Sequence, residues 1–413
     1  MKKAYLRRTS SDILGAVALF CKYHDLLHKE IIKGNIRSSL DRGAFVRPQD
    51  VLSANILKLL GEERRSDSFA YGPEKGDEKL REKIAEVENI RHGTSYSIND
   101  VAMMPGAWSG LEFAIHEILK LERGNFEKKP VAVIGPTLYQ MFHNPINYLG
   151  INVIGYDFVV PNTTHIPTLE DIDAIFEEKP KIIVVSNPNN PDGLYLPNNI
   201  LKEMIERGRD EGGYIIVDEM QNCFPKNKGK ELQYGSWIQS PNVVRVDSPS
   251  KKYALAEYRV GWVIADSNLL GDRMHGITGR MSGMMGNAAR AANTALAYIM
   301  TKEIEKLESG IDFLEDVRRD LLEKEKQVLE RLASNSGIKK VFSRDACINL
   351  TVQTNFHGTD IELAQKLMKK GTLIMPASGY GYRPEDAVLR ITFAERNEKI
   401  NHALDCLQSV LGD

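Results

Sequence analysis

Two different spacings of apolar residues alternate along residues 100–265, and together they predict an α/β fold. Short apolar runs have the length of buried strands, whereas the segments between them repeat apolar residues every three or four positions, as helices do. This alternation indicates a doubly wound, mainly parallel sheet with ligand groups at the carboxyl ends of its strands. The predicted strands cover residues 101–104, 131–134, 181–186, 214–218 and 242–246, and a further one starts at Arg259.

A long amphipathic helix separates this sheet from the C-terminal part of the chain. One face of the helix carries Ile311, Leu314, Val317, Leu321 and Leu322, and the other is charged. Beyond it the pattern predicts strand 347–352, a capped helix from Thr359, strands 373–376 and 388–394, and a final helix. We therefore predict a large domain over residues 49–300 and a smaller α+β C-terminal domain over residues 301–413.

Residues 1–48 form a third segment, which consists of an N-terminal helix and an irregular stretch that crosses to the large domain. The helix opens at Ser10 and Ser11, and its apolar residues 13–21 follow basic residues, as in a signal peptide. Asp12 interrupts that pattern, no small-residue cleavage site follows, and an amphipathic helix continues instead. The run is also shorter than the roughly 20 residues that span a bilayer. We expect a cytoplasmic protein without a membrane partner.

Composition and charge narrow the classes of function. With 42% hydrophobic and 27% charged residues, the chain is typical of a globular protein with a large core. Its formal net charge of −2 gives no basis for binding nucleic acid. The cysteines lack the spacing of metal ligands, so no metal site is predicted and they are interpreted as buried thiols in a reducing compartment. They are Cys21, Cys223, Cys347 and Cys406.

The stretch from Asp247 to Ala265 concentrates the candidate chemistry. Ser248, Ser250, Lys251 and Arg259 fall together between two apolar runs. Hydroxyl groups and an arginine suit a phosphate, and a lysine that is desolvated near other cations loses its proton and becomes a nucleophile for carbonyl carbon. The combination favours a phosphorylated aldehyde held as a Schiff base. The alternative interpretation is a surface Ser/Lys loop that leads into a strand.

This stretch resembles the Ser-x-Ser-Lys…Gly-x-Arg-x-Gly-Trp block of the fold-type I pyridoxal-phosphate (PLP) enzymes, in particular the class I/II aminotransferases. It departs from that block at Glu257-Tyr258, where Gly-Leu is common. The resemblance extends from about Arg37 to Asp413. It implies that Lys251 holds PLP as a Schiff base and that Ser248, Ser250 and Arg259 bind the cofactor phosphate.

Other segments match blocks of the same family that bind the cofactor. Gly106, Ala107 and Trp108 lie between a predicted strand and a helix start, where backbone N–H groups and the helix dipole favour an anion. They match the family's phosphate turn. In Gly-Pro-Thr-Leu-Tyr139, the resemblance implies that Tyr139 stacks on the pyridine ring, with Phe142 as second choice. Tyr71 is the candidate to reach the phosphate in a neighbouring subunit.

Two further matches concern the cofactor ring. Asn187-Pro-Asn-Asn-Pro-Asp-Gly193 resembles the signature Asn-Pro-x-Asn-Pro-Thr-Gly, which assigns Asn190 to the cofactor's 3′-oxygen and puts Asp192 in place of threonine. Asp218 ends a predicted buried strand, where a carboxylate is costly unless it meets a cation such as a protonated pyridine nitrogen. The family's tyrosine that donates to the 3′-oxygen is replaced by Gln221, as in class III aminotransferases.

Two arginines are candidates for binding the substrate. Arg390 lies in Leu-Arg-Ile-Thr-Phe-Ala, which resembles a family strand whose arginine grips the substrate α-carboxylate bidentately. An arginine inside an apolar strand is otherwise hard to account for. Arg280 opens a stretch of small residues and methionines that suits a subunit interface, where it would reach the partner's active site. The alternative for Arg280 is a solvated side chain.

The resemblance implies a PLP-dependent aminotransferase of amino-acid metabolism, a homodimer with shared active sites. It would move an amino group from an L-amino acid to a 2-oxo acid, with catalytic residues Lys251, Asp218 and Tyr139. One alternative is another PLP reaction on the same scaffold, such as β-elimination, racemisation or cyclisation. A second is a non-catalytic PLP-binding sensor domain, which the absence of a basic segment before the motifs disfavours.

Overall fold

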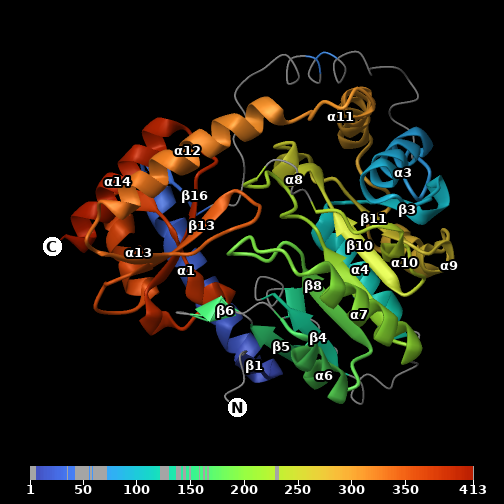
Figure 1. Cartoon of the computed structure of the whole chain (residues 1–413), viewed down its shortest axis with the longest axis horizontal. Helices are drawn as coiled ribbons and strands as arrows, with labels where there is room; N and C mark the ends of the chain where they lie inside the picture. The colour runs from blue at the N-terminus through green and yellow to red at the C-terminus, as the bar shows by residue number, and fades with distance from the viewer. Residues whose placement is uncertain are drawn as a thin grey trace.

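A computed structural model describes residues 6–34, 36–41, 55, 58, 72–120, 130–135, 141–142, 146–147, 150–157, 159–160, 163–164, 167–227 and 232–412. Figure 1 shows a twisted sheet with helices on both faces, and beside it a C-terminal part in orange and red. The N-terminal helix α1, in blue, runs along the C-terminal part. The chain therefore forms two layered parts, as its patterns predict.

The large sheet has eight strands in the order β1-β5-β4-β8-β9-β10-β11-β3. The five strands from β5 to β10 are parallel, and β1, β11 and β3 are antiparallel to their neighbours. In chain order the strands are β1 (Leu6–Arg8), β3 (Val101–Met104), β4 (Val131–Ile134), β5 (Val153–Asp157), β8 (Ile182–Ser186), β9 (Tyr214–Asp218), β10 (Val243–Asp247) and β11 (Gly261–Ala265).

Alternate residues of these strands face two separate cores. Val131 and Val133 of β4 pack with α4 (Ala107–Lys120) and α10 (Gly276–Met285), whereas Ala132 and Ile134 pack with α6 (Leu169–Glu177) and α7 (Asn198–Asp210). Parallel strands buried on both faces read as continuous apolar runs, which is why they were predictable. A third core joins α3 (Glu78–His92) to α11 (Arg290–Glu308).

The C-terminal part is built on a four-stranded antiparallel sheet, β12-β13-β16-β15. Helices α12, α13 and α14 pack around it, as predicted for an α+β domain. The elements are α12 (Glu315–Ala333), β12 (Ile338–Val341), β13 (Asn349–Thr354), α13 (Asp360–Lys369), β14 (Thr372–Leu373), β15 (Met375–Pro376), β16 (Val388–Thr392) and α14 (Asn397–Leu411).

The N-terminal segment contacts both parts. Strand β1 pairs with β5 at the edge of the large sheet, and β2 (Ser38–Ser39) pairs with β14. Between them α1 (Ser10–Ile32), capped by Thr9, buries Tyr23 and Leu27 against α13. The short elements α8 (Pro249–Lys252), α9 (Ser267–Leu270), β6 (Val159–Val160) and β7 (Thr163–Thr164) complete the described structure.

Several predicted boundaries were wrong. The helix expected to include Ile311 and Leu314 begins at Glu315, because Asp312 opens a turn before it, accepting hydrogen bonds from the backbone N–H groups of Leu314 and Glu315. The strand predicted over 373–376 is two strands in different sheets, and the strand predicted to end at residue 394 ends at Thr392. Strands β1 and β5 were not predicted. The domain limits at residues 48 and 300 stay predictions.

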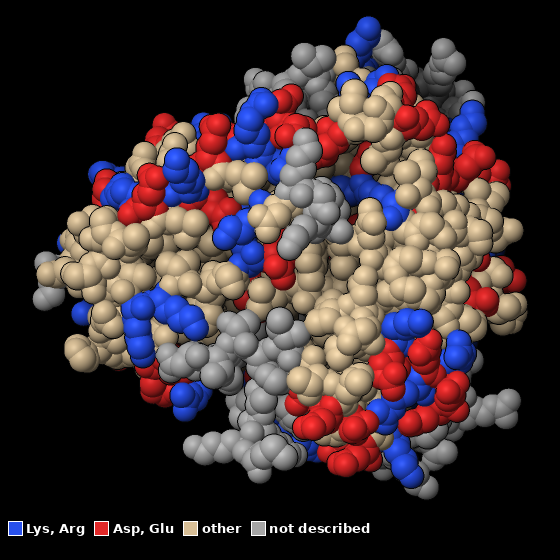
Figure 2. All heavy atoms as spheres, in the orientation of Figure 1, with Lys and Arg blue, Asp and Glu red and all other residues tan. Residues whose placement is uncertain are grey.

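Surface charge and cysteine burial bear on two further expectations. Figure 2 shows Lys and Arg interspersed with Asp and Glu over one face of the molecule. Cys223, Cys347 and Cys406 are buried as expected, but Cys21 is exposed, because it lies on the solvent face of α1. Among the described residues, no helix is both long enough and apolar enough to cross a membrane.

Candidate active site

The candidate site lies where several parallel strands end at one edge of the large sheet. The register pairs Ser186 of β8 with Asp218 of β9, and Asp218 with Val246 of β10. The segments that follow these strands therefore leave the sheet together. They carry Asn190, Gln221 and Lys251, which are distant in sequence.

Lys251 lies on α8, directly after β10. Ser248 caps this short helix by accepting a 3.4 Å hydrogen bond from the Ser250 backbone N–H, and Pro249 starts it. Burial lowers the pKa of Lys251 to about 8, and the guanidinium groups of Arg390 and Arg259 act in the same direction. The lysine is thus a desolvated amine among cations, the condition for a nucleophilic lysine.

The predicted phosphate turn lies against Arg259. Gly106 has φ +85, and a Cβ atom there would lie 2.7 Å from the Nη2 atom of Arg259. A Cβ atom on Gly261, where β11 begins, would lie 2.6 Å from the backbone nitrogen of Ala107. Because Gly106 and Gly261 have no side chains, the first residues of α4 and the Arg259 side chain can lie close together. Backbone N–H groups at the start of α4 and the Arg259 fork form a donor set suited to a phosphate.

Asp218 is buried at the carboxyl end of β9. Its Oδ1 accepts a 3.0 Å hydrogen bond from the Met220 backbone N–H, and no ion pair is found for it among the described residues. Burial raises the pKa of this carboxyl to about 7, and the charge of Glu219 contributes to that increase. A cationic ligand group here would stabilise the ionised form and lower that pKa.

Gln221 lies three residues beyond Asp218 and is also buried. Its Oε1 atom has no hydrogen-bond partner in the described part of the chain. An unsatisfied buried amide oxygen costs about 1–3 kcal/mol, so a partner is expected for such an atom. A polar ligand group in contact with Gln221 would be a partner of this kind.

The Asn187–Gly193 loop is held by its own side chains and by the C-terminal part. Asp192, which replaces the family's threonine, accepts hydrogen bonds from Asn189 Nδ2 at 3.0 Å and from the Leu194 backbone at 3.2 Å. The carbonyl oxygen of Gly193 accepts from the backbone of Asp345 at 3.1 Å. A short polar side chain is thus sufficient to close this turn, and the loop couples the two parts of the molecule.

Arg390 on β16 brings the second part of the molecule into the site. Its Nη1 lies 3.5 Å from Asn190 Oδ1, its Nη2 donates to the Asp41 carbonyl oxygen, and its guanidinium carbon lies 4.7 Å from the Tyr380 ring centroid. The side chain is 5% exposed, and its Nε has no partner among the described residues.

Two other buried arginines differ from Arg390 in that each forms an ion pair with a carboxylate. Arg344 pairs with Glu325 at 2.5 Å, and Arg245 pairs with Glu219 at 2.8 Å. For Arg390, the described residues include no carboxylate in an ion pair. A buried guanidinium without an anion is suited to bind a carboxylate from a ligand.

A comparison with known proteins decides the family. The sequence profile described as aminotransferase class I and II matches residues 39–407. The chain belongs to this family. Its activity is therefore that of an aminotransferase.

Individual relatives of this aminotransferase are distant. It is 23% identical to an aspartate aminotransferase of Pyrococcus horikoshii over 347 residues, 83% of each chain. It is 22% identical over 390 residues to a glutamate-pyruvate aminotransferase of Haemophilus influenzae, with 93% of this chain and 91% of that protein covered. Aspartate aminotransferase of Thermus thermophilus with maleate has a similar structure, with a TM-score of 0.78, 18% identity and 96% of each chain covered. The structural likeness shows that this aminotransferase has the fold-type I architecture.

Some predicted residues of this aminotransferase do not join the group around Lys251. Arg280 lies on α10, where its Nε is 3.6 Å from Glu117 Oε2. Glu117 follows Ala107 by ten residues on α4, about 15 Å along the helix from the phosphate turn. Trp108, the last residue of that turn, is half-buried and packs on the core of α4. Phe142 is buried in the same core. Tyr71 and Tyr139 lie outside the described residues.

Sequence reasoning missed three residues near this aminotransferase's site. Asp41 and Tyr380 hold Arg390 through a carbonyl oxygen and a ring face, contacts that depend on backbone position and carry no sequence signal. Cys223 lies close enough to Lys251 to act on its charge. Its position two residues after Gln221 was the available clue.

Proposed function

We propose that this aminotransferase binds PLP at Lys251 and transfers an amino group from an L-amino acid to a 2-oxo acid. One observation carries the proposal. Asp218, Arg259 and Arg390 come from three separate segments, and all three lie close enough to the buried Lys251 to influence its pKa. The family and its relatives imply PLP as cofactor.

The described residues fit each end of the proposed cofactor. The start of α4, Arg259 and Ser248 would hold the phosphate, where Gly106 leaves space that a side chain would fill. Asp218 would meet the pyridine nitrogen, a cation that would pair with a buried carboxylate for which the described residues provide no ion pair. Gln221 and Asn190 would hold the 3′-oxygen. Tyr139 would stack on the ring, as predicted from the sequence.

When bound, PLP supplies an electron sink for negative charge at the substrate's α-carbon. Asp218 would hold a proton on the pyridine nitrogen, because a buried carboxylate stabilises an adjacent cation. Lys251 would hold the cofactor aldehyde and, as a free amine, would move the proton at the substrate's α-carbon. Its pKa of about 8 leaves a substantial fraction of free amine near neutral pH, as a general base requires.

Arg390 would bind the substrate's α-carboxylate. Tyr380, the Asp41 carbonyl oxygen and Asn190 restrict its guanidinium to one orientation before substrate arrives. This preorganisation reduces the cost of fixing the substrate. The first substrates to test are aspartate and glutamate, since relatives are named for them.

The assembly and location are also part of the proposal. We propose a cytoplasmic homodimer in which Tyr71 and Arg280 contribute to the neighbouring site. The family resemblance supports this assembly. Arg280 lies 3.6 Å from Glu117 in the same chain, so a role of Arg280 in the neighbouring site has to be compatible with this contact.

A half-reaction screen tests the proposed function. Holoenzyme is mixed with each common amino acid, and the cofactor spectrum is followed together with 2-oxo acid release. Conversion to pyridoxamine phosphate with at least one amino acid, lost in Lys251→Ala, is the expected result. Ammonia release or racemised substrate without any pyridoxamine form would contradict transamination and favour the lyase or racemase alternative.

A further inference from the structure

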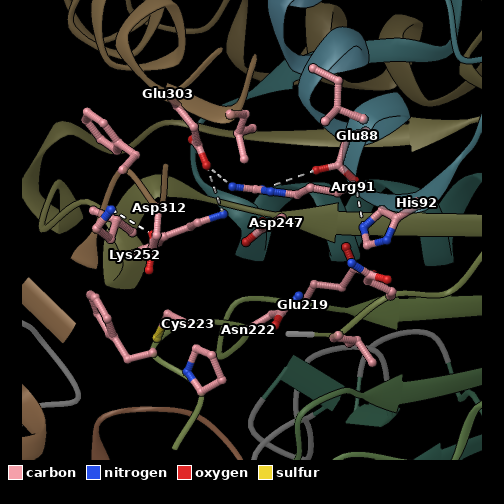
Figure 3. A pocket seen from close by; sticks show the side chains of 18 of the residues that line it. Glu88, Arg91, His92, Glu219, Asn222, Cys223, Asp247, Lys252, Glu303 and Asp312 are labelled. Atoms are coloured by element: carbon pink, nitrogen blue, oxygen red, sulfur yellow. Dashed lines mark hydrogen bonds and ion pairs between the residues drawn. The ribbon is translucent and has the colours of Figure 1, made fainter. Parts of the chain in front are cut away.

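A second cavity lies on the other side of the lysine-bearing helix α8. Its volume is about 390 Å³, and it is enclosed by the carboxyl ends of α3 and α11, the segment after β9 and the connection between α11 and α12. Figure 3 shows Lys252 and Arg91 reaching toward Glu303, with Asp247 beneath them. None of these four residues belongs to the site around Lys251.

Lys252 is directed into this cavity. Consecutive residues on a helix point about 100° apart, so Lys251 and Lys252 enter different compartments. The Nζ atom of Lys252 lies 3.7 Å from Glu303 Oε1, and its side chain is 16% exposed. Glu303 also pairs with Arg91 and accepts a hydrogen bond from the Tyr253 hydroxyl. The lysine is therefore held in place beside open space.

The groups around Lys252 suit an amine nucleophile with an acid beside it. Burial and, after it, the charge of Arg91 lower the pKa of Lys252 to about 7. Burial also raises the pKa of Asp247 well above its usual range, as does Glu219. The Cys223 thiol in the same cavity does not compete, because burial raises its pKa. Other charged or titratable groups at this cavity are Glu88, His92, Arg245, Asp312 and Arg318.

We propose that Lys252 is a second imine-forming lysine, which captures small uncharged aldehydes that enter this cavity. The Lys252 amine adds to the carbonyl carbon, and one proton passes from the amine nitrogen to the carbonyl oxygen. The Asp247 carboxyl then gives its proton to the same oxygen, the C–O bond breaks and the oxygen leaves as water. The balanced result converts a neutral amine, an aldehyde and a carboxylic acid into an iminium, a carboxylate and one water. The iminium and Asp247 are then an ion pair.

The positive charge of the product favours an aldehyde over other electrophiles. The iminium on Lys252 carries a positive charge that compensates Glu303 and the newly ionised Asp247. Acylation or carbamate formation would give no cation at Lys252, and buried carboxylates beside it would gain no compensation. The arginines in the described lining are already paired, Arg91 with Glu303, Arg245 with Glu88 and Glu219, and Arg318 with Asp312, so this lining offers no free arginine to a phosphorylated aldehyde such as PLP. Phe224, Leu307 and Phe313 offer apolar walls for the aldehyde's carbon body.

Reductive trapping tests this inference independently of the proposed function. The full-length holoenzyme is treated with benzaldehyde and cyanoborohydride near neutral pH, and modified lysines are located by peptide fragmentation. Lys252 is expected to be benzylated at least roughly tenfold faster than the exposed Lys202 and Lys326, because Lys252 is desolvated beside the cavity whereas those two side chains lie in solvent. Fragment masses distinguish adducts on Lys251 from adducts on Lys252. If PLP did not bind and Lys251 reacted instead, its adduct would therefore not be mistaken for one on Lys252.

Two variants sharpen the trapping experiment. Ile311→Trp, at the exposed rim of the cavity, should slow benzylation of Lys252 by narrowing the entrance and leave Lys202 unchanged. Lys252→Arg should remove the adduct and keep the positive charge. Labelling of Lys252 no faster than that of Lys202 in the parent protein would overturn the inference. So would equal labelling of Lys252 in the parent and in a folded Ile311→Trp protein.

Discussion

The guanidinium of Arg259 occupies space that only a glycine at position 106 leaves open. A Cβ atom at residue 106 would lie 2.7 Å from Nη2 and 3.3 Å from Cζ of Arg259. The backbone donors of the phosphate turn and the arginine fork therefore converge on one point. This convergence is the structural basis for placing a phosphate at the turn between β3 and α4, beside Arg259.

Gly106→Ala should weaken PLP binding. The new methyl group displaces Arg259 from the turn and also strains the backbone at φ +85. We expect the dissociation constant of PLP to rise roughly tenfold or more, equivalent to about 1.4 kcal/mol, in a spectroscopic titration of the apoenzyme. Gly212→Ala is the matched control, because Gly212 has φ +72 and open space around it. Equal losses in both variants would show that backbone strain, not Arg259, is responsible.

Arg390→Lys should weaken amino-acid binding and spare the cofactor. Lysine keeps the charge but cannot form the bidentate contact with a carboxylate. The loss of one charge-assisted contact corresponds to about 1.5–3 kcal/mol, or roughly 10- to 150-fold in substrate affinity. Substrate titrations of the holoenzyme measure the effect, and the PLP dissociation constant serves as control. Unchanged affinity for every amino acid would remove Arg390 from the substrate site.

The rate at which apoenzyme binds PLP covalently should rise with pH through about 8. Below that pH Lys251 is protonated and cannot attack the aldehyde, and above it the amine is free, whereas an ordinary lysine would need a pH near 10.5. Stopped-flow absorbance at a series of pH values gives the profile. A rate that still rises steeply beyond pH 9.5, about one unit below the ordinary lysine value, would contradict the lowered pKa.

Asp192→Asn should make the protein more stable at alkaline pH. Burial raises the pKa of Asp192 to about 7, so the folded state binds an extra proton between the ordinary value of 3.8 and about 7. The stability from that proton is present at low pH and is lost as pH rises through 7. Asparagine has no such cost, and the gain is on the order of a few kcal/mol. Urea unfolding at pH 5 and pH 8 would check this, and a variant that gains equally at both values would contradict it.

Local motifs and long-range contacts differed in how far sequence could predict them. Ser248, Lys251 and Arg259 are close in sequence, and parallel strands necessarily bring Asn190 and Asp218 to the same edge. The contact between Arg390 and Asn190 joins residues 200 positions apart, and the family resemblance gave each residue a role in the site without predicting that contact. Periodicity could not reveal strand β1, because its three residues are at the sheet edge and are rich in arginine. The sequence could not predict that Lys251 and Lys252 enter separate compartments, because this depends on the directions of their side chains in the structure.

Gln221→Ala tests the residue at which this aminotransferase leaves the family pattern. Our proposed contact has the amide donate a hydrogen bond to the cofactor's 3′-oxygen, which favours the ionised oxygen. Removing the donor should raise the pH at which the bound cofactor's absorption changes by on the order of one unit, since a typical hydrogen bond contributes about 1 kcal/mol. Transamination should survive, because Asp218 still protonates the pyridine nitrogen. Gln233→Ala is the control, because this exposed glutamine lines the other cavity. An unshifted spectral transition in Gln221→Ala would show that the Gln221 amide does not donate to the cofactor's 3′-oxygen.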